Sequence, residues 1–239
     1  MNLLQLFKNT LRTIYAFGWL IPSSILGILV ALFSLSHRRG IDALVSSYGF
    51  LSTTTPGIKY SINGKEHLNK RPTIFIFNHQ SHSELFILAK LFKKNISAIA
   101  KKELKTSAIG PILWAGGMLF IDRNKSSEAI EIFNSAKEYL NRGISFAIAP
   151  EGTRSNQYQL GQFKKGAFRL AMATKVSLTP IVFENSHDVL PKGKILLRPA
   201  IVKLHILPPI HTGHWQLINL EERIDEVRNL FVEKISAKK

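Results

Sequence analysis

Apolar positions form one long uninterrupted run near the start of the chain. From Ile14 to Ser36 there is no charged residue, and Ile, Leu, Val and Phe dominate. An α-helix of this length can cross the roughly 30 Å hydrocarbon core of a bilayer. Pro22 lies inside the run and predicts a kink or break there. A second, weaker apolar stretch runs from Ile41 to Leu51 and ends at Pro56-Gly57. We therefore expect membrane-anchoring helices in residues 1–56.

The charges that flank the long run do not give its orientation. Lys8 and Arg12 precede it and Arg38 and Arg39 follow it, so the positive-inside rule finds no asymmetry. Two helices that enter a single leaflet would place both basic ends on the cytosolic face, and we favour this arrangement over a single crossing. A buried core helix is the remaining alternative, but so long an uncharged run is unusual in a small soluble domain. We expect a membrane-associated protein whose second domain, residues 57–239, lies in the cytoplasm.

After Gly57, short apolar runs alternate with helical patterns. The apolar runs predict strands at 73–77, 96–100, 118–121, 145–149, 178–183, 195–197 and 201–206. Apolar residues at helical spacing predict helices at 84–92, 104–114, 126–141, 167–174 and 220–235. Strands separated by helices indicate an α/β fold. We expect a mixed, largely parallel sheet flanked by helices and preceded by the N-terminal membrane-embedded helical motif.

The excess of basic residues indicates which classes of molecule the protein binds. Lys and Arg number 32 against 16 acidic residues, a formal net charge of +16. Such an excess attracts either nucleic acid or an anionic lipid surface with phosphate-bearing substrates. The apolar N-terminal run favours the membrane, and the lysines are scattered rather than arranged in a nucleic-acid-binding motif. There is no cysteine, which excludes disulfides, thiolate metal sites and a Cys nucleophile.

The most informative polar segment is 78–84 (NHQSHSE), directly after a predicted strand. Polar residues at the carboxyl end of a strand lie where ligands usually bind in an α/β sheet. His79 and Glu84 are five positions apart, across a strand-to-helix turn, so the carboxylate can fold back and bind one imidazole nitrogen. The other nitrogen would then be free to act as a base on a substrate hydroxyl. A helix cap with surface histidines is the alternative interpretation of this segment alone.

Two further segments follow predicted strands and carry arginine. Asp122-Arg123 ends the strand at 118–121, and a guanidinium there can bind a phosphate through two hydrogen bonds. Glu151-Gly152-Thr153-Arg154 follows the strand at 145–149, where Gly152 allows close backbone approach and Arg154 offers a second anion-binding group. A surface ion pair and a turn with a salt bridge are the plain alternatives. The order and spacing of the three segments together favour a site.

The set His79-x4-Glu84, Gly117-x-x-Phe120-Ile121-Asp122-Arg123 and Glu151-Gly152-Thr153-Arg154 resembles the glycerolipid acyltransferase family. This family includes bacterial and eukaryotic 1-acylglycerol-3-phosphate (lysophosphatidic acid) acyltransferases. The segment Ala100–Leu104 and a strand containing Pro180 also resemble family segments. The likeness covers roughly residues 60 to 210.

The resemblance implies a role for each matching residue. His79 would be the general base, and Glu84 would orient it. Arg123 and, by its location, Lys101 would contact the acceptor phosphate. Glu151, Gly152, Thr153 and Arg154 would shape the acceptor site. The resemblance also implies a lysophospholipid acceptor, an acyl-CoA or acyl-carrier-protein donor, no metal and no other cofactor.

The chain departs from the family pattern at Glu84, where the family usually has Asp. Glu carries the same charge on a longer stem, so it can keep the pairing with a shifted backbone or weaken it. Other acceptors stay open, namely glycerol 3-phosphate, another lysophospholipid or a lyso-amino-acid lipid. A non-enzymatic membrane-binding protein with a decayed site is the alternative from another class.

Overall fold

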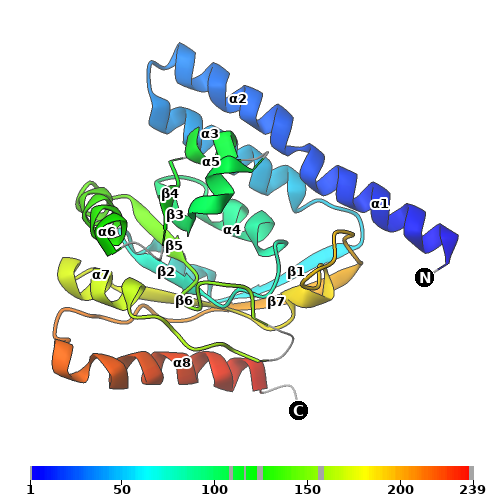
Figure 1. Cartoon of the computed structure of the whole chain (residues 1–239). Helices are drawn as coiled ribbons and strands as arrows, with labels where there is room; N and C mark the ends of the chain where they lie inside the picture. Colours follow the sequence, from blue (N-terminus) through cyan, green and yellow to red (C-terminus); the bar gives the residue numbers. More distant parts are fainter. Residues whose placement is uncertain (1, 108–109, 116, 123–125, 156–158, 237–239) are drawn as a thin grey trace.

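The computed structural model describes residues 2–107, 110–115, 117–122, 126–155 and 159–236. In this part of the chain the strands form a seven-stranded sheet of order β1-β7-β6-β2-β5-β3-β4 (Figure 1). The strands are β1 (Ile58–Asn63), β2 (Ile74–Phe77), β3 (Ile96–Lys101), β4 (Leu119–Ile121), β5 (Ser145–Ile148), β6 (Leu178–Phe183) and β7 (Ala200–Ile206).

Most of the sheet is parallel. Strand β2 pairs in parallel with β5 and β6, and β3 pairs in parallel with β4 and β5. Only at β7 does the direction reverse, because β7 runs antiparallel to β6 and parallel to β1. The carboxyl ends of β2, β3, β4, β5 and β6 therefore meet at one edge of the sheet. The prediction of a mixed, largely parallel α/β sheet is confirmed.

Helices cover both faces of the sheet, and the core consists of two hydrophobic clusters, one on each face. Strand β2 contributes to both. Its four residues are all buried, and alternate side chains point to opposite faces. Phe75 and Phe77 pack in a cluster with residues of α4 (Glu84–Phe92). Ile74 and Ile76 pack in a second cluster with residues of α6, α7 and α8. These last helices are α6 (Ser126–Asn141), α7 (Gly166–Thr174) and α8 (Leu220–Ser236), and the short α5 covers Gly110–Ala115.

The N-terminal residues form three helices, α1 (Leu3–Gly18), α2 (Leu20–Phe33) and α3 (His37–Ser52). The interruption expected near Pro22 lies at Trp19, since Pro22 falls in the first turn of α2, where a missing N–H is tolerated. Helices α2 and α3 form a close hairpin (Figure 1). A Cβ added at Gly40 would lie 2.6 Å from the carbonyl oxygen of Gly27, so this crossing requires glycine.

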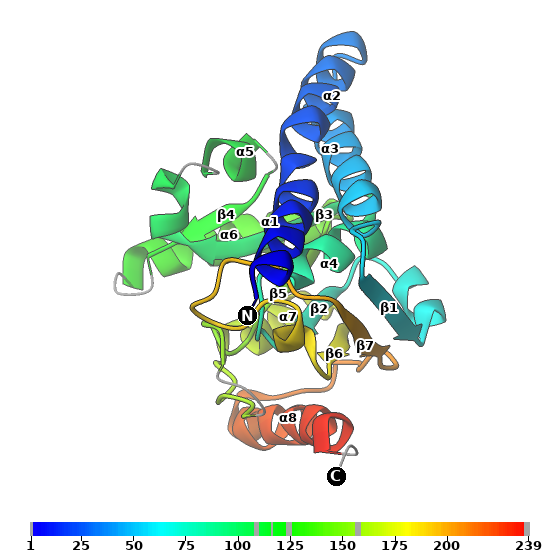
Figure 2. The same cartoon turned by 90° about the vertical axis from the view of Figure 1, so that its right-hand side faces the viewer.

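Arginines on either side of the long apolar run join the N-terminal helices to the sheet domain. Ahead of the run, in α1, Arg12 Nε donates a 2.7 Å hydrogen bond to the carbonyl of Pro56, and Arg12 Nη1 donates to the carbonyl of Leu197 at 3.5 Å. Beyond the run, Arg38 at the start of α3 donates to the carbonyl of Ile96 at 3.0 Å and pairs with Asp42. The α1–α2 segment is thus held on the outside of the molecule, and α2 rises with α3 beyond the sheet domain (Figures 1 and 2).

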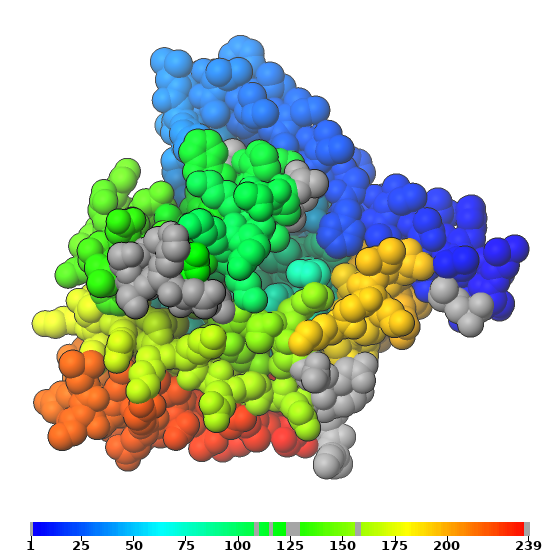
Figure 3. Space-filling model, in the orientation of Figure 1, coloured from blue at the N-terminus to red at the C-terminus, as the bar shows by residue number. Residues whose placement is uncertain are grey.

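The exposed surface of α1 and α2 is largely apolar. Residues 3–33 contain an 18-residue window with a mean hydropathy of 2.1, and only 17% of that window is buried. Figure 3 shows these helices as an uncovered ridge along one side of the molecule. A soluble core helix would be mostly buried, so the core interpretation is disfavoured. The exposed large apolar side chains include Leu4, Phe7, Leu11, Ile14, Ile21, Ile25, Ile28 and Leu32.

Three element predictions need correction. Residues 195–197, expected as a strand, form an irregular segment, because Leu197 bonds through its backbone to Thr13 of α1 and not to a strand. The helix expected at 104–114 is divided into a 3-10 turn at Lys102–Thr106 and α5, with residues 108–109 outside the described part. Strand β1 was missed, although Ile58, Tyr60 and Ile62 alternate with polar residues. The domain division at residue 56 stays a prediction.

Candidate active site

His79 and Glu84 form a bonded pair at the carboxyl edge of the sheet. His79 lies two residues beyond the end of β2, and Glu84 is the first residue of α4. The imidazole Nδ1 lies 2.6 Å from Glu84 Oε2. A carboxylate only accepts hydrogen bonds, so Nδ1 carries the proton and Nε2 has a free lone pair. Nε2 makes no hydrogen bond with any residue that the structure describes, and the His79 side chain remains 21% exposed.

The second carboxylate oxygen of Glu84 is held from three sides. Oε1 accepts the backbone N–H groups of Gln80 at 2.8 Å and Ser81 at 2.9 Å. It also accepts the hydroxyl of Ser186 at 2.5 Å. The Glu84 side chain is fully buried, and a buried carboxylate is tolerated only when its oxygens are bonded in this way. The longer Glu stem thus places one oxygen on His79 and the other in a cradle of N–H and O–H donors.

Glu151 holds the backbone of this turn. Its Oε1 accepts the N–H of His79 at 2.8 Å, and its Oε2 accepts the N–H of Gly161 at 2.8 Å. Burial raises the pKa of Glu151 above its usual value, although the hydrogen bonds from His79 and Gly161 oppose this rise. A Cβ at Gly161 would lie 2.9 Å from Oε2, so the close contact depends on glycine. Both oxygens of Glu151 are used to position backbone.

Arg154 brings positive charge to the same turn. The next residue, Ser155, donates its N–H to the carbonyl of His79 at 2.8 Å, which ties the β5 loop to the β2 loop. Desolvation, with electrostatic interactions with Arg154 and His79 as smaller causes, lowers the pKa of His82 to about 4. His82 is therefore neutral at physiological pH, and Arg154 lies close enough to contribute to its lowered pKa.

The remaining predicted site residues follow neighbouring strands. Lys101 ends β3 at the same edge, and its side chain is exposed. Gly152 has a positive φ of 74°, which fits the turn after β5, and Thr153 is exposed. Arg123 lies outside the described residues, so the structure places only Asp122 at the end of β4. Their roles in substrate binding stay predictions.

Two residues that sequence reasoning missed complete the site. Ser186 lies beyond the end of β6, in the polar run Glu184–Asp188, and bonds to Glu84. Asn78 exchanges two hydrogen bonds with the backbone of Phe183, at 2.7 and 2.8 Å, and so fastens the end of β2 to the end of β6. Both residues follow an apolar strand directly or within a few positions, as His79 and Glu151 do, so the same sequence pattern could have identified them.

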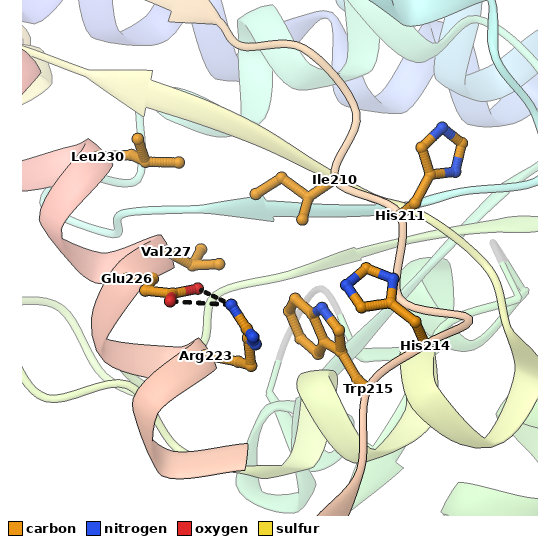
Figure 4. A pocket seen from close by; sticks show the side chains of 8 residues that line it. All are labelled: Ile210, His211, His214, Trp215, Arg223, Glu226, Val227 and Leu230. Atoms are coloured by element: carbon orange, nitrogen blue, oxygen red, sulfur yellow. Dashed lines mark hydrogen bonds and ion pairs between the residues drawn. The ribbon is translucent and has the colours of Figure 1, made fainter. Parts of the chain in front are cut away.

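A separate groove of about 390 Å³ lies away from this edge. It is lined by the segment before α8 and by α8 itself, and Arg223 and Glu226 form an ion pair in its wall (Figure 4). None of the predicted site residues lines it, so we do not assign it to the chemistry of His79. Among the described residues, no three His, Asp or Glu side chains are placed to hold a metal ion.

Comparison with known proteins assigns the chain to a family. The model of the acyltransferase family matches residues 59–184, which include the His79–Glu84 pair and the Glu151–Arg154 turn. The chain belongs to the acyltransferase family. It is 34% identical over 184 residues to a 1-acyl-sn-glycerol-3-phosphate acyltransferase of Saccharomyces cerevisiae, covering 75% of this chain and 60% of the yeast protein.

Other relatives carry the same description. A 1-acyl-sn-glycerol-3-phosphate acyltransferase of Limnanthes alba is 30% identical over 76% of this chain and 65% of its own length. The acyltransferase fold is also that of a solved structure, the 1-acyl-sn-glycerophosphate acyltransferase of Thermotoga maritima. Its TM-score is 0.76 at 23% identity, over 97% of this chain and 99% of the other. The chain thus matches less than two thirds of the length of the curated relatives but nearly all of the bacterial fold.

Proposed function

We propose that the chain is an O-acyltransferase that makes phosphatidic acid for phospholipid biosynthesis. It would move a fatty acyl group from acyl-CoA or acyl-carrier protein to the free hydroxyl of 1-acylglycerol 3-phosphate. The observation that carries the proposal is the buried Glu84 carboxylate bonded to His79 Nδ1, which leaves Nε2 as a base at an open edge of the sheet. Family membership and the descriptions of the relatives support the same reaction.

The reaction needs one proton carrier and no enzyme nucleophile. Nε2 of His79 takes the proton of the acceptor hydroxyl as that oxygen attacks the thioester carbonyl. Glu84 stabilises the imidazolium that forms, because its carboxylate lies 2.6 Å from Nδ1. The tetrahedral oxyanion then collapses, the C–S bond breaks, and His79 returns the proton to the leaving thiolate. The thioester is already activated, so the proposal includes neither a metal nor another cofactor.

Cationic side chains at the same edge fit an acceptor phosphate. Lys101 ends β3 and Arg154 follows β5, and both strands have their carboxyl ends on this side of the sheet. Arg123 lies outside the described residues and is assigned the same role from the sequence resemblance alone. Arginine binds phosphate through two parallel hydrogen bonds, which fixes the orientation of the headgroup. We assign Glu151 to positioning, since both of its oxygens already hold backbone N–H groups.

The proposal includes attachment to one leaflet of a membrane. Arg12 in α1 and Arg38 in α3, on either side of the long apolar run, both bond to the sheet domain. A helix crossing the bilayer would place these two residues on opposite sides of the hydrocarbon core, so their contacts with one domain support the one-leaflet arrangement. The α1–α2 segment would therefore lie in the interface with its apolar surface in the leaflet. A cytoplasmic catalytic domain would then meet both a lipid acceptor and a soluble donor.

A sibling reaction on another acceptor fits the same catalytic pair, so the test uses a panel. Purified full-length protein is incubated with labelled acyl-CoA and acyl-carrier protein and with 1-acylglycerol 3-phosphate, glycerol 3-phosphate and other lysolipids, and products are identified by mass. His79→Ala should lower transfer by roughly 10²- to 10⁴-fold. His214→Ala, at an exposed histidine beside the separate groove, is the matched control and should leave transfer unchanged.

The outcomes separate the alternatives. Transfer to 1-acylglycerol 3-phosphate above the other acceptors supports the proposed substrate, and preference for another acceptor replaces it. Absence of transfer with every donor and acceptor would favour the non-enzymatic membrane-binding protein. Full activity of a folded His79→Ala variant would remove His79 from the mechanism.

A further inference from the structure

The irregular segment 191–199, called here the 191–199 loop, carries an exposed apolar side chain. Ile195 is 80% exposed, which is unusual for Ile within a packed domain. Lys192, Lys194 and Arg198 are exposed on either side of it. Lys194 and Arg198 take part in none of the ion pairs found among the described residues. An apolar tip between free cations is the pattern of a segment that meets an anionic lipid surface.

The loop has a fixed position beside α1. The N–H of Leu197 donates to Thr13 Oγ1 at 2.8 Å, and Arg12 Nη1 contacts the carbonyl of Leu197 at 3.5 Å. Leu197 itself is fully buried in the cluster that contains Ala16 of α1. Figures 1 and 3 show the loop in gold against the blue α1, and Figure 2 shows the same contact from the side. Ile195 is thus exposed on an anchored loop that lies against α1, the first helix of the apolar ridge.

We propose that the 191–199 loop is a second membrane contact, separate from the N-terminal helices. Ile195 would enter the boundary between headgroups and acyl chains, and Lys194 and Arg198 would bind the phosphates of anionic lipids. The inference rests on the proposed attachment of α1 and α2 to one leaflet. Continuity with that apolar ridge favours a bilayer over an acidic protein, which would recognise the same cations.

The contact would have a consequence for the acceptor site. Lys192 Nζ donates a 2.8 Å hydrogen bond to the carbonyl of Arg154, so the loop is joined to the turn that carries the proposed phosphate-binding arginine. Seating the loop on the bilayer would hold Arg154 at the level of the headgroups. A lysophospholipid could then reach the site laterally with its phosphate beside the guanidinium.

The absence of cysteine in the chain allows a direct test. Ile195→Cys is labelled with an environment-sensitive fluorophore in the full-length protein and mixed with vesicles of phosphatidylglycerol and phosphatidylethanolamine. Ile25→Cys in α2, 54% exposed, reports the proposed anchor. Ile218→Cys is the matched control, since Ile218 is 91% exposed and lies just before α8, which packs on the opposite face of the sheet from α1.

A membrane contact predicts about a twofold rise in emission at positions 195 and 25 and none at 218. Lys194→Ala should weaken binding to the anionic vesicles by about fivefold and leave binding to phosphatidylcholine vesicles unchanged. If emission rises at position 25 but not at position 195, the loop does not contact the membrane, while the proposed attachment of α1 and α2 is supported. Unchanged emission at both positions overturns the inference and the anchor together. A rise at 195 with acidic carrier protein but not with vesicles assigns the loop to a protein partner and overturns the membrane contact.

Discussion

Ser186 donates a 2.5 Å hydrogen bond to Glu84 from 102 positions further along the chain. The bond reaches Oε1, the carboxylate oxygen that does not contact His79. It joins the polar ends of two neighbouring parallel strands, β2 and β6, across the site. Because rotation of the carboxylate would break this bond, Ser186 fixes the oxygen that orients the imidazole.

Ser186→Ala should therefore lower kcat by about tenfold with little change in KM, since one hydrogen bond to a charged group is worth roughly 1.5–3 kcal/mol. Steady-state kinetics of acyl transfer measure both constants. Ser186→Thr keeps the hydroxyl and should restore much of the rate. Ser61→Ala, at an exposed serine of β1, is the control. Equal kcat for Ser186→Ala and the parent protein would exclude a positioning role.

Two substitutions of Glu84 test the importance of its charge and of its length separately. Glu84→Gln keeps the side-chain length but replaces an acceptor oxygen by an NH₂ group, so the preferred tautomer of His79 is lost. We expect a fall in kcat of roughly 10²- to 10⁴-fold. Glu84→Asp retains the charge but withdraws it from a cradle fitted to Glu, and should cost roughly tenfold. An Asp variant faster than the parent would show that the cradle does not depend on the longer stem.

Gly161 tests the second carboxylate through a steric change. A Cβ there would lie 2.9 Å from Glu151 Oε2 and would displace the carboxylate that holds the N–H of His79. Gly161→Ala should lower kcat by about tenfold, as expected for a small misplacement of a catalytic group. Gly166→Ala is the matched control, because a Cβ at Gly166 meets no atom within 4 Å. Similar rates for the two variants would contradict the role of Glu151.

The sequence predicted the His79–Glu84 pair of the candidate site because these two residues are close in the chain. His79 and Glu84 lie in one turn, after a strand whose apolar run is unmistakable, and the structure brings them within 2.6 Å. Ser186 follows the same kind of signal after β6. Its partner could not be identified without the strand order, since only the pairing of β6 with β2 brings it to Glu84.

The wrong strand at 195–197 shows the limit of local patterns. Three consecutive apolar residues fit a buried strand as well as they fit any other apolar contact. In the fold, Leu197 is buried against α1, while Ile195 is 80% exposed. The backbone of Leu197 bonds to Thr13, 184 positions away, and this contact takes the place of pairing with another strand. No pattern within the segment contains that information.

The lowered pKa of His82 predicts how stability depends on pH. Its value falls from 6.5 to about 4 in the folded protein, so the unfolded state binds more protons between these values. Stability should therefore decrease as the pH is lowered from 6.5 towards 4. His82→Gln cannot bind that proton and should show a smaller fall of Tm over this range, measured by thermal unfolding at a series of pH values. Parallel curves for the two proteins would show that His82 does not titrate as its surroundings imply.

Charge placed on the apolar ridge tests the anchor without disturbing the core. Ile21 and Ile28 are 66% and 60% exposed on α2, so Glu at these positions should be accommodated in the folded protein. In a leaflet the same carboxylates would lose water, and each should weaken vesicle binding by about tenfold or more. Ile218→Glu, at a 91% exposed position beside α8, is the control for added negative charge. Flotation with vesicles at high salt measures the apolar part of binding, and transfer to detergent-dispersed substrate checks that the site is intact. If the double variant Ile21→Glu/Ile28→Glu binds vesicles as strongly as Ile218→Glu does, the membrane contacts a surface other than α2.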